Sequence, residues 1–264
     1  MEWDTDFIER SKMLEPLREI ASKLRGHSQW PDREALDAVI AERDLLTGGG
    51  ARLHLVPPSP SGESYESRIY LRGEMQYRER EWHDFFNLLA WLAYPRTKRA
   101  LNAAHHRALM LTQAHSSRTG TRGRVRDALT VFDESGAIVV STGADLLADV
   151  HAFQWKPLFW AQRARVRRQV RFYLFGHAML EKALRPYIGM TAHALLIPVS
   201  QELISSEPAR QLEMIDELAS AQVAAMTTPQ ALSPLPLLGV PGWWQANEAE
   251  AFYDNEEYFR RGRR

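Results

Sequence analysis

The chain has no cysteine among its 264 residues. That absence excludes disulfide bonds, thiolate metal sites, iron–sulfur clusters and a cysteine nucleophile. Any metal ion would have to be held by histidine nitrogens and by carboxylate or amide oxygens. Net charge is absent as well, because 33 Lys and Arg residues balance 33 Asp and Glu residues. No overall field draws the protein to nucleic acid or anionic lipid, so either role would need a local patch.

Long apolar runs are also missing from the sequence. No stretch approaches the roughly 18 uninterrupted apolar residues that a membrane span requires. The first residues, MEWDTDFIERSKMLEPLREI, are acidic and amphipathic, whereas a secretory signal is basic and then continuously apolar. We expect a soluble, cytoplasmic protein without membrane contacts.

Four familiar catalytic signatures do not occur in the sequence. They are the phosphate loop ending in Gly-Lys-Ser/Thr, the Gly-x-Gly-x-x-Gly fingerprint, the Gly-x-Ser-x-Gly elbow and the His-Glu-x-x-His zinc motif. Their absence disfavours NTPases, dinucleotide-binding enzymes, α/β-hydrolases and zincins.

Helical and strand patterns together predict an α+β fold, a helix-dominated single domain with a small, mostly antiparallel sheet. Apolar residues recur at helical spacing over residues 4–24, 31–46, 82–112, 144–184 and 209–226. Five β-rich runs predict the strands, at 52–56, 67–72, 128–132, 137–141 and 192–198. The sequence DESG at 133–136 separates two of these runs and predicts a hairpin turn.

Composition divides the chain into three segments. Residues 1–50 form an N-terminal helical segment, 51–230 the main α+β domain, and 231–264 a C-terminal arm. The arm carries two adjacent tryptophans and four further aromatic residues. We expect it to wrap and pack on the main domain, because unburied rings would leave a sticky tail. An exposed tail that binds a partner is the alternative.

The stretch EWHDFFNLLAWLAYPRTKRALNAAHH at 81–106 places polar residues in an apolar helical run. Asn87 lies four residues after His83 and three after Asp84, so one helix end offers an imidazole, a carboxylate and an amide. They serve either as metal ligands and a general base, or as helix caps and polar contacts.

The next helix carries Lys98, Asn102 and His106 at intervals of four residues. This stripe is either the solvated side of an amphipathic helix or part of a functional site. Histidine and asparagine are unusual where glutamate or lysine would favour the helix more.

His177 and Glu181 stand four apart in VRFYLFGHAMLEKAL, a helical pattern that is apolar nearly all round. A buried imidazole and carboxylate must find partners, because unpaired burial is costly. They form either a structural network or a set of ligands and acid–base groups in a pocket. Gly176 lowers helix stability and would allow another backbone or a ligand to approach closely.

Other charged residues are harder to assign. Asp127 directly follows Arg126 and would orient an imidazole or hold a divalent ion, whereas Asp133 and Glu134 are assigned to the hairpin turn. Basic clusters occur at 118–126, at 163–171 and at the C-terminal RRGRR. Such clusters are usually solvated faces paired with acids, and nucleic-acid binding is the alternative.

Several blocks of the sequence resemble one protein family. They are YLRGE, WHDFFNLLAWLAYPRTKRALN, RDALTVFDESG, FGHAMLEKAL, and LPLLGVPGWW followed by FYDN and YFR. Together they are similar to an uncharacterised bacterial family, domain of unknown function 3025, from about Tyr70 to the C-terminus. The resemblance implies no activity, but its blocks contain the polar residues selected above, which favours a shared pocket. These are Arg72, Glu74, His83, Asp84, Asn87, Lys98, Asn102, Arg126, Asp127, Asp133, Glu134, His177 and Glu181.

Our leading hypothesis is a metal-dependent hydrolase of a phosphoester or nucleotide-like substrate. The expected catalytic residues are His83, Asp84, Asn87, Asn102, Asp127, His177 and Glu181. The expected metal ligands are His83, Asp84, His177 and Glu181, with Mn, Fe, Zn or Mg as the ion. Arg72, Lys98 and Arg126 are expected to bind a small anionic substrate.

A second hypothesis assigns no catalysis to these residues. The protein would then be a binding module for a small anion or for a protein or nucleic-acid partner. The same polar cluster would be a buried structural network.

Overall fold

A computed structural model describes residues 2–24, 26–60, 62–114 and 120–262. Its helices are α1 (Arg18–Ser22), α2 (Arg33–Arg43), α3 (Tyr65–Arg72), α4 (Trp82–Ala93), α5 (Pro95–Ala114), α6 (Gly120–Ser135), α7 (Ala144–His151), α8 (Arg163–Gln169), α9 (His177–Lys182), α10 (Gln201–Ser205) and α11 (Pro208–Ala225). Its strands are β1 (His54–Val56), β2 (Glu74–Gln76), β3 (Gly136–Ser141), β4 (Val170–Leu174), β5 (Thr191–Pro198) and β6 (Ser233–Pro236). Helices dominate and the sheets are small, so the predicted α+β class is confirmed.

The main sheet has four strands in the order β4-β3-β5-β6. The outer pairs, β3 with β4 and β5 with β6, are antiparallel, whereas the central pair of β3 and β5 is parallel. Every residue of β3 is buried, as expected for a strand with neighbours on both sides and helices against it. The other two strands, β1 and β2, pair in parallel to form a separate two-stranded sheet.

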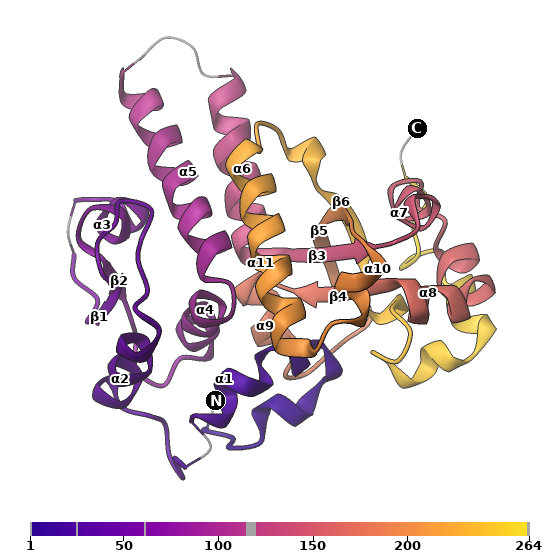
Figure 1. Cartoon of the computed structure of the whole chain (residues 1–264), viewed down its shortest axis with the longest axis horizontal. Helices are drawn as coiled ribbons and strands as arrows, with labels where there is room; N and C mark the ends of the chain where they lie inside the picture. The colour runs from indigo at the N-terminus through magenta and orange to yellow at the C-terminus, as the bar shows by residue number, and fades with distance from the viewer. Residues whose placement is uncertain (1, 25, 61, 115–119, 263–264) are drawn as a thin grey trace.

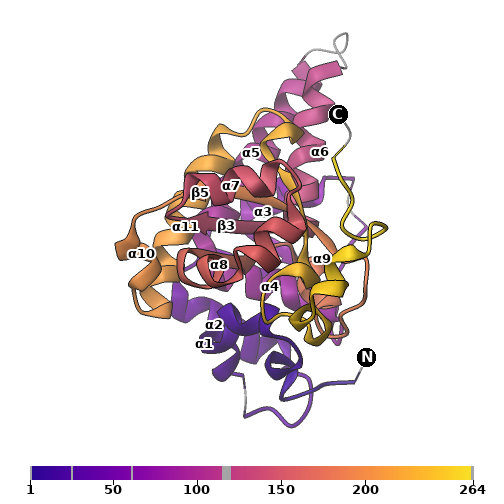
Figure 2. The same cartoon turned by 90° about the vertical axis from the view of Figure 1, so that its right-hand side faces the viewer.

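The helices lie around these two sheets. α5 and α6 form an antiparallel pair that projects beyond the rest of the molecule (Figure 1). α11 packs against α5 and β5, and in the turned view α7 and α8 lie in front of β3 and β5 (Figure 2). α3, β1 and β2 lie on the other side of α5 from the main sheet (Figure 1). None of the helices within the described ranges is both long and apolar enough to cross a membrane.

The strand predicted at 67–72 is wrong, because these residues belong to α3. The Ser64 hydroxyl accepts a hydrogen bond from the backbone N–H of Ser67 at 3.3 Å and caps the start of the helix. Gly73 adopts φ of 73° and ends the helix, with its N–H donating to the Ile69 carbonyl at 2.8 Å. Ser64 and Gly73 are the residues that indicate a helix here, whereas the alternation of apolar residues between them resembles a strand.

The strand at 128–132 and the hairpin turn at 133–136 are also wrong, because α6 continues to Ser135 and β3 follows at once. Ala128, Leu129 and Phe132 are fully buried. Leu129 lies one residue and Phe132 four residues after Ala128, so all three lie on one face of a helix. A Cβ at Gly136 would come within 2.2 Å of the Phe132 carbonyl oxygen. Glycine therefore lets the chain pass from helix to strand without an intervening loop.

The long helix predicted over 144–184 is interrupted. The structure divides the stretch into α7, a π-helical turn at Pro157–Ala161, α8, β4 and α9. β4 pairs with β3 through five residues, from Val170 opposite Ser141 to Leu174 opposite Ala137. Pairing with an already buried strand outweighs the local helical pattern of these residues.

The N-terminal residues and the C-terminal arm both pack on the body. Residues 4–24 form two short 3-10 helices followed by α1 instead of one helix, and Pro16 lies inside the second 3-10 helix. In the arm, Asn247 is fully buried and its amide donates to the Leu238 and Val240 carbonyls at 2.7 and 2.8 Å. Tyr253 and Tyr258 are buried beside it. The described part of the arm is thus ordered and packed, as the sequence predicts.

The start of α5 is capped from α11. Asp216 accepts hydrogen bonds from the backbone N–H groups of Arg96 at 2.9 Å and Thr97 at 2.8 Å. The Thr97 hydroxyl donates in return to the Asp216 carbonyl at 3.1 Å. Because Asp216 is 2% exposed, water cannot readily replace these bonds.

We predict that Asp216→Ala lowers the free energy of unfolding by about 2 kcal/mol or more, since two buried N–H groups lose their acceptor. Asp216→Asn should lower it less, because one amide oxygen can still accept. Urea unfolding followed by circular dichroism measures both changes. Glu217→Ala is the matched control, since its exposed side chain only approaches Arg96 at 3.8 Å. Equal unfolding midpoints for Asp216→Ala and this control would contradict the capping role.

Candidate functional site

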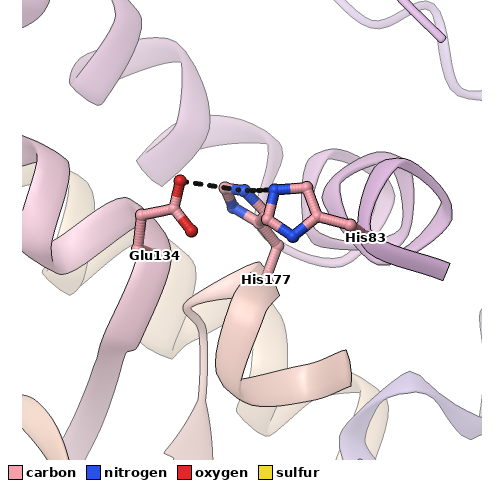
Figure 3. Close-up of side chains that lie close together, drawn as sticks. All are labelled: His83, Glu134 and His177. Carbon is pink, nitrogen blue, oxygen red and sulfur yellow. Dashed lines mark hydrogen bonds and ion pairs between the residues drawn. The ribbon is translucent and has the colours of Figure 1, made fainter. Parts of the chain in front are cut away.

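Two histidines and a glutamate from three different helices converge in space. His83 lies in the first turn of α4, His177 is the first residue of α9, and Glu134 lies at the end of α6. The two imidazoles face each other through their Nε2 atoms, which are 3.1 Å apart (Figure 3). Glu134 Oε1 lies 3.6 Å from His177 Nε2. One ligand atom from each residue falls within 4.8 Å of the others, a spacing that one metal ion could bridge.

A close backbone contact brings the end of α6 to the start of α9. The N–H groups of Phe175 and Gly176 both donate to the Gly136 carbonyl, at 3.0 and 2.9 Å. A Cβ at Gly176 would lie 2.4 Å from the Gly136 nitrogen, so no larger residue fits there without a shift. The close approach expected at Gly176 is thus made by another part of the backbone.

Each imidazole has a carboxylate near its Nδ1 atom, on the side away from the other ring. Glu181 Oε2 lies 3.3 Å from His83 Nδ1. An ionised carboxylate can only accept, so this contact places a proton on Nδ1 and leaves the Nε2 lone pair of a neutral ring facing His177. Asp133 Oδ1 is the carboxylate nearest His177 Nδ1, at 3.8 Å.

Burial sets the ionisation of this group. Burial lowers the pKa of His177 to about 4, against an opposing effect of the nearby Asp133. Burial would raise the pKa of Asp133, but the neighbouring Lys98 and His177 outweigh it and hold the pKa below the usual value. For Glu134, burial raises the pKa of the carboxyl. The imidazole of His177 is therefore neutral at pH 7, while Asp133 is a carboxylate.

A buried lysine lies beneath the histidines. Lys98 is 3% exposed, and its ammonium donates to Asp133 Oδ1 and, at 2.9 Å, to Asn87 Oδ1. It also lies 5.6 Å from the centre of the Trp91 ring, a favourable cation–π distance. Asp133 is thereby neutralised and engaged, so it is poorly placed to bind a metal ion as well.

The histidines open into a pocket of about 740 Å³. Its walls come from the start of α3, the start of α4, the inner sides of α5 and α6, and the start of α9. The lining residues are Pro58, Ser64, Tyr65, Glu66, Gln76, Arg78, His83, Asp84, Asn87, His105, Leu109, Arg126, Thr130, Asp133, Glu134 and His177. The volume suits a small molecule or part of a larger ligand.

Most of the predicted site residues belong to this pocket or touch it. Five line it directly, namely His83, Asp84, Asn87, Arg126 and His177. Glu181 and Lys98 support it from behind through His83 and Asn87. Asp84 differs from its expected role as a ligand, because Arg78 binds both of its oxygens, at 2.8 and 2.9 Å.

Three further predicted site residues also lie outside the pocket lining. Asn102 is buried and serves as a structural link, since its side chain accepts from Gly48 N–H and donates to Glu66. Asp127 is exposed on α6. Arg72 forms ion pairs with Glu63 and with Glu74.

The polar stripe of α5 is not a solvated face. Lys98 and Asn102 are buried, and His106 stacks on Tyr70 of α3 with ring centres 3.9 Å apart. His105, one residue earlier, is buried and lines the pocket. The stripe instead joins α5 to α3 and to the pocket.

The sequence interpretation missed Glu134 and Tyr65. The sequence predicts a hairpin turn at Glu134, whereas the structure places it near the end of α6 beside His177. The signal for this site in the sequence is the pair of adjacent carboxylates at 133 and 134, shortly before Gly136. Tyr65 lies between the runs predicted as strands at 52–56 and 67–72 and carries no signal of its own.

The two internal basic clusters differ in their relation to the pocket. Arg163, Arg165 and Arg167 are paired with acids, namely Glu248, Asp145 and Glu248. Residues 118 and 119 of the other predicted cluster lie outside the described part of the chain. Within the described residues, Arg126 is the member of that cluster that lines the pocket.

The lowered pKa of His177 predicts a pH dependence of stability. The unfolded chain takes up a proton at this residue near pH 6.5, and the folded chain only near pH 4. Its contribution is therefore complete above pH 6.5 and is lost as the pH falls from 6.5 towards 4. The loss is on the order of 3 kcal/mol. Urea unfolding across this pH range, with a chelator present, should show a flatter profile for His177→Gln than for the wild type.

His54→Gln is the control for that experiment, because His54 is exposed. This variant should keep the wild-type pH profile. If the wild type and His177→Gln instead lose stability equally between pH 6.5 and 4, the buried neutral imidazole is not the cause.

Comparison with known proteins identifies the family. A family model described as a protein of unknown function, DUF3025, matches residues 54–263. Searches among curated proteins and among solved structures find no match. The matched range contains every residue that lines the pocket, together with the main sheet and most of the C-terminal arm. The chain belongs to the DUF3025 family.

Proposed function

We propose that this protein binds a divalent metal ion between His83, His177 and Glu134, and uses it to hydrolyse an anionic phosphoester or nucleotide-like substrate. The observation that carries the proposal is the 3.1 Å approach of the two Nε2 atoms at the wall of the pocket.

The spacing suits shared coordination of one ion. Two imidazole nitrogens bound to one zinc ion at about 2.0–2.1 Å lie about 3.4 Å apart at the tetrahedral angle. The observed separation of 3.1 Å is close to that value. Glu134 Oε1, 3.6 Å from His177 Nε2, is placed as a third ligand. Three protein ligands leave a position open for water or substrate, as in catalytic metal sites.

The hydrogen-bond directions also favour a cation at this point. Glu181 holds a proton on His83 Nδ1, which turns the lone pair of Nε2 towards His177. A proton on His177 Nδ1 would face the carboxylate of Asp133, which lies 3.8 Å away. In that tautomer both Nε2 lone pairs are free, and a cation bound by both of them would relieve their repulsion. Imidazole and carboxylate together suit Mn, Fe or Zn better than Mg, which prefers oxygen ligands and retained water.

The surrounding groups support hydrolysis of an anion. A bound ion of this kind would polarise a phosphoryl oxygen and lower the pKa of water. In the reaction, the water oxygen bonds to phosphorus, the ester P–O bond breaks, and a proton reaches the departing oxygen. Arg126 lines the pocket without an ion pair among the described residues and would neutralise the substrate.

The alternative is a binding module in which a hydrogen bond between the two imidazoles replaces the metal ion. His177, in the tautomer with its proton on Nε2, would donate to His83 Nε2, and His83 Nδ1 would donate to Glu181. Such a network is structural and needs no ion. Both functions use the same side chains, so substitution alone does not separate them. Metal analysis does, because only the hydrolase requires a bound ion.

We predict one metal ion per chain, because Asp133 is engaged by Lys98 and the described residues then offer a single set of clustered ligands. Protein purified without an affinity tag or chelator should carry near-stoichiometric metal by inductively coupled plasma mass spectrometry. His83→Ala, His177→Ala and Glu134→Gln should each lose most of it. Asp127→Asn is the matched control on α6 and should keep it, since Asp127 is exposed outside the pocket. No metal in the wild type, before or after incubation with Mn²⁺ or Zn²⁺, would favour the binding module.

We further predict that metal-loaded protein hydrolyses simple phosphoesters such as p-nitrophenyl phosphate or bis-p-nitrophenyl phosphate. Arg126→Ala should raise KM about tenfold, because a charged hydrogen-bond donor is lost from the pocket. Arg72→Ala is the matched control and should leave KM unchanged, since Arg72 is engaged with Glu63 and Glu74. Equal effects of both variants would show that the substrate does not meet Arg126.

A further inference from the structure

A chain of buried hydrogen bonds runs from Lys98 to the wall of the pocket. Lys98 Nζ donates to Asn87 Oδ1 at 2.9 Å, and Asn87 Nδ2 donates to the Tyr65 hydroxyl at 3.0 Å. Lys98 and Asn87 are 3% and 6% exposed. The chain links α5, α4 and the first residue of α3.

The direction of these bonds is fixed by chemistry. An ammonium group can only donate, so the amide atom that it touches must be the oxygen of Asn87. The amide nitrogen then points to Tyr65 and donates to it. The Tyr65 oxygen is therefore an acceptor in this bond, and its own proton is turned elsewhere.

The hydroxyl proton of Tyr65 is left without an acceptor among the described residues. Tyr65 lines the same pocket as His83, His177 and Glu134. Among the described residues, its hydroxyl has no hydrogen bond other than the one from Asn87. His83 and Asn87 are four residues apart on α4, so the hydroxyl and the imidazole pair occupy neighbouring parts of one wall.

We propose that the Tyr65 hydroxyl is a substrate-binding group that donates a hydrogen bond to an anionic oxygen held beside the His83–His177–Glu134 centre. Asn87 and Lys98 are positioning residues, because they act on the substrate through Tyr65. This inference rests on the proposed function for the class of ligand, a phosphate-like anion. An anionic acceptor gains more from this donor than a neutral one would.

The test is a double-mutant cycle with inorganic phosphate as the probe. Phosphate affinity is measured by calorimetry for wild type, Tyr65→Phe, Asn87→Asp and the double variant, each with and without Mn²⁺ loading. Tyr65→Phe should weaken phosphate binding about tenfold, because a hydrogen bond to a charged acceptor is lost. In the Asn87→Asp background the introduced carboxylate accepts the Tyr65 proton. Tyr65→Phe should then weaken binding less than about twofold further, and this non-additivity marks the coupling.

Two readouts separate this inference from the proposed function. Metal content, measured on the same samples, should be unchanged by Tyr65→Phe, and Tyr70→Phe on the same helix should leave phosphate affinity unchanged. Equal effects of Tyr65→Phe in both backgrounds, no effect in the first, or no phosphate binding by the wild type would each overturn the role of Tyr65. Lack of metal in every sample overturns the metal-dependent function instead, while a tenfold loss in Tyr65→Phe would still support the anion site.

Discussion

The contact between the backbones of Gly136 and Gly176 is the constraint on which the site depends. It joins two corners of the chain: the one between α6 and β3, and the one between β4 and α9. Glu134 lies two residues before one glycine, and His177 follows the other directly. A Cβ at Gly176 would lie 2.4 Å from the Gly136 nitrogen, so the two corners can approach this closely only with glycine at 176. A Cβ at Gly136 would instead meet the Phe132 carbonyl oxygen of its own helix. The sheet register of β3 and β4 then holds both ends in place.

Charge neutralisation decides which polar groups remain available. Lys98 engages Asp133, and Arg78 engages both oxygens of Asp84, so neither carboxylate is left alone in the wall. A buried charge without a partner would be costly, and these pairs remove that cost. His83 and His177 are left facing each other, with Glu134 beside them at 44% exposure. The pocket therefore brings ligand-type atoms together at one point, while Asp84 and Asp133 are paired with cations.

The helices that carry the site are anchored outside it. The α5 helix is capped by Asp216 from α11, and its inner side joins α3 through Asn102 and through the stacking of His106 on Tyr70. These contacts hold α3 against α5, and the hydrogen bond from Asn87 to Tyr65 joins the first residue of α3 to α4. Rigid support of this kind keeps the polar groups of a site at fixed distances. The N-terminal aromatic residues Trp3 and Phe7 add packing against Trp82 at the start of α4.

The sequence by itself determined the helix-dominated α+β class, the strands β3 and β5, the packed arm, and the choice of His83, Asn87 and His177 as polar residues that need partners. Apolar periodicity and the cost of burying polar groups are local properties, so they can be read along the chain. Only the tertiary structure decided that Glu134 lies beside the histidines, that Arg78 binds Asp84, and that Tyr65 lines the same pocket. Those facts depend on pairing between distant segments, above all β4 with β3 and α9 with α6. Such pairing follows from the burial of a whole sheet and from close backbone contact, which no short stretch of sequence specifies.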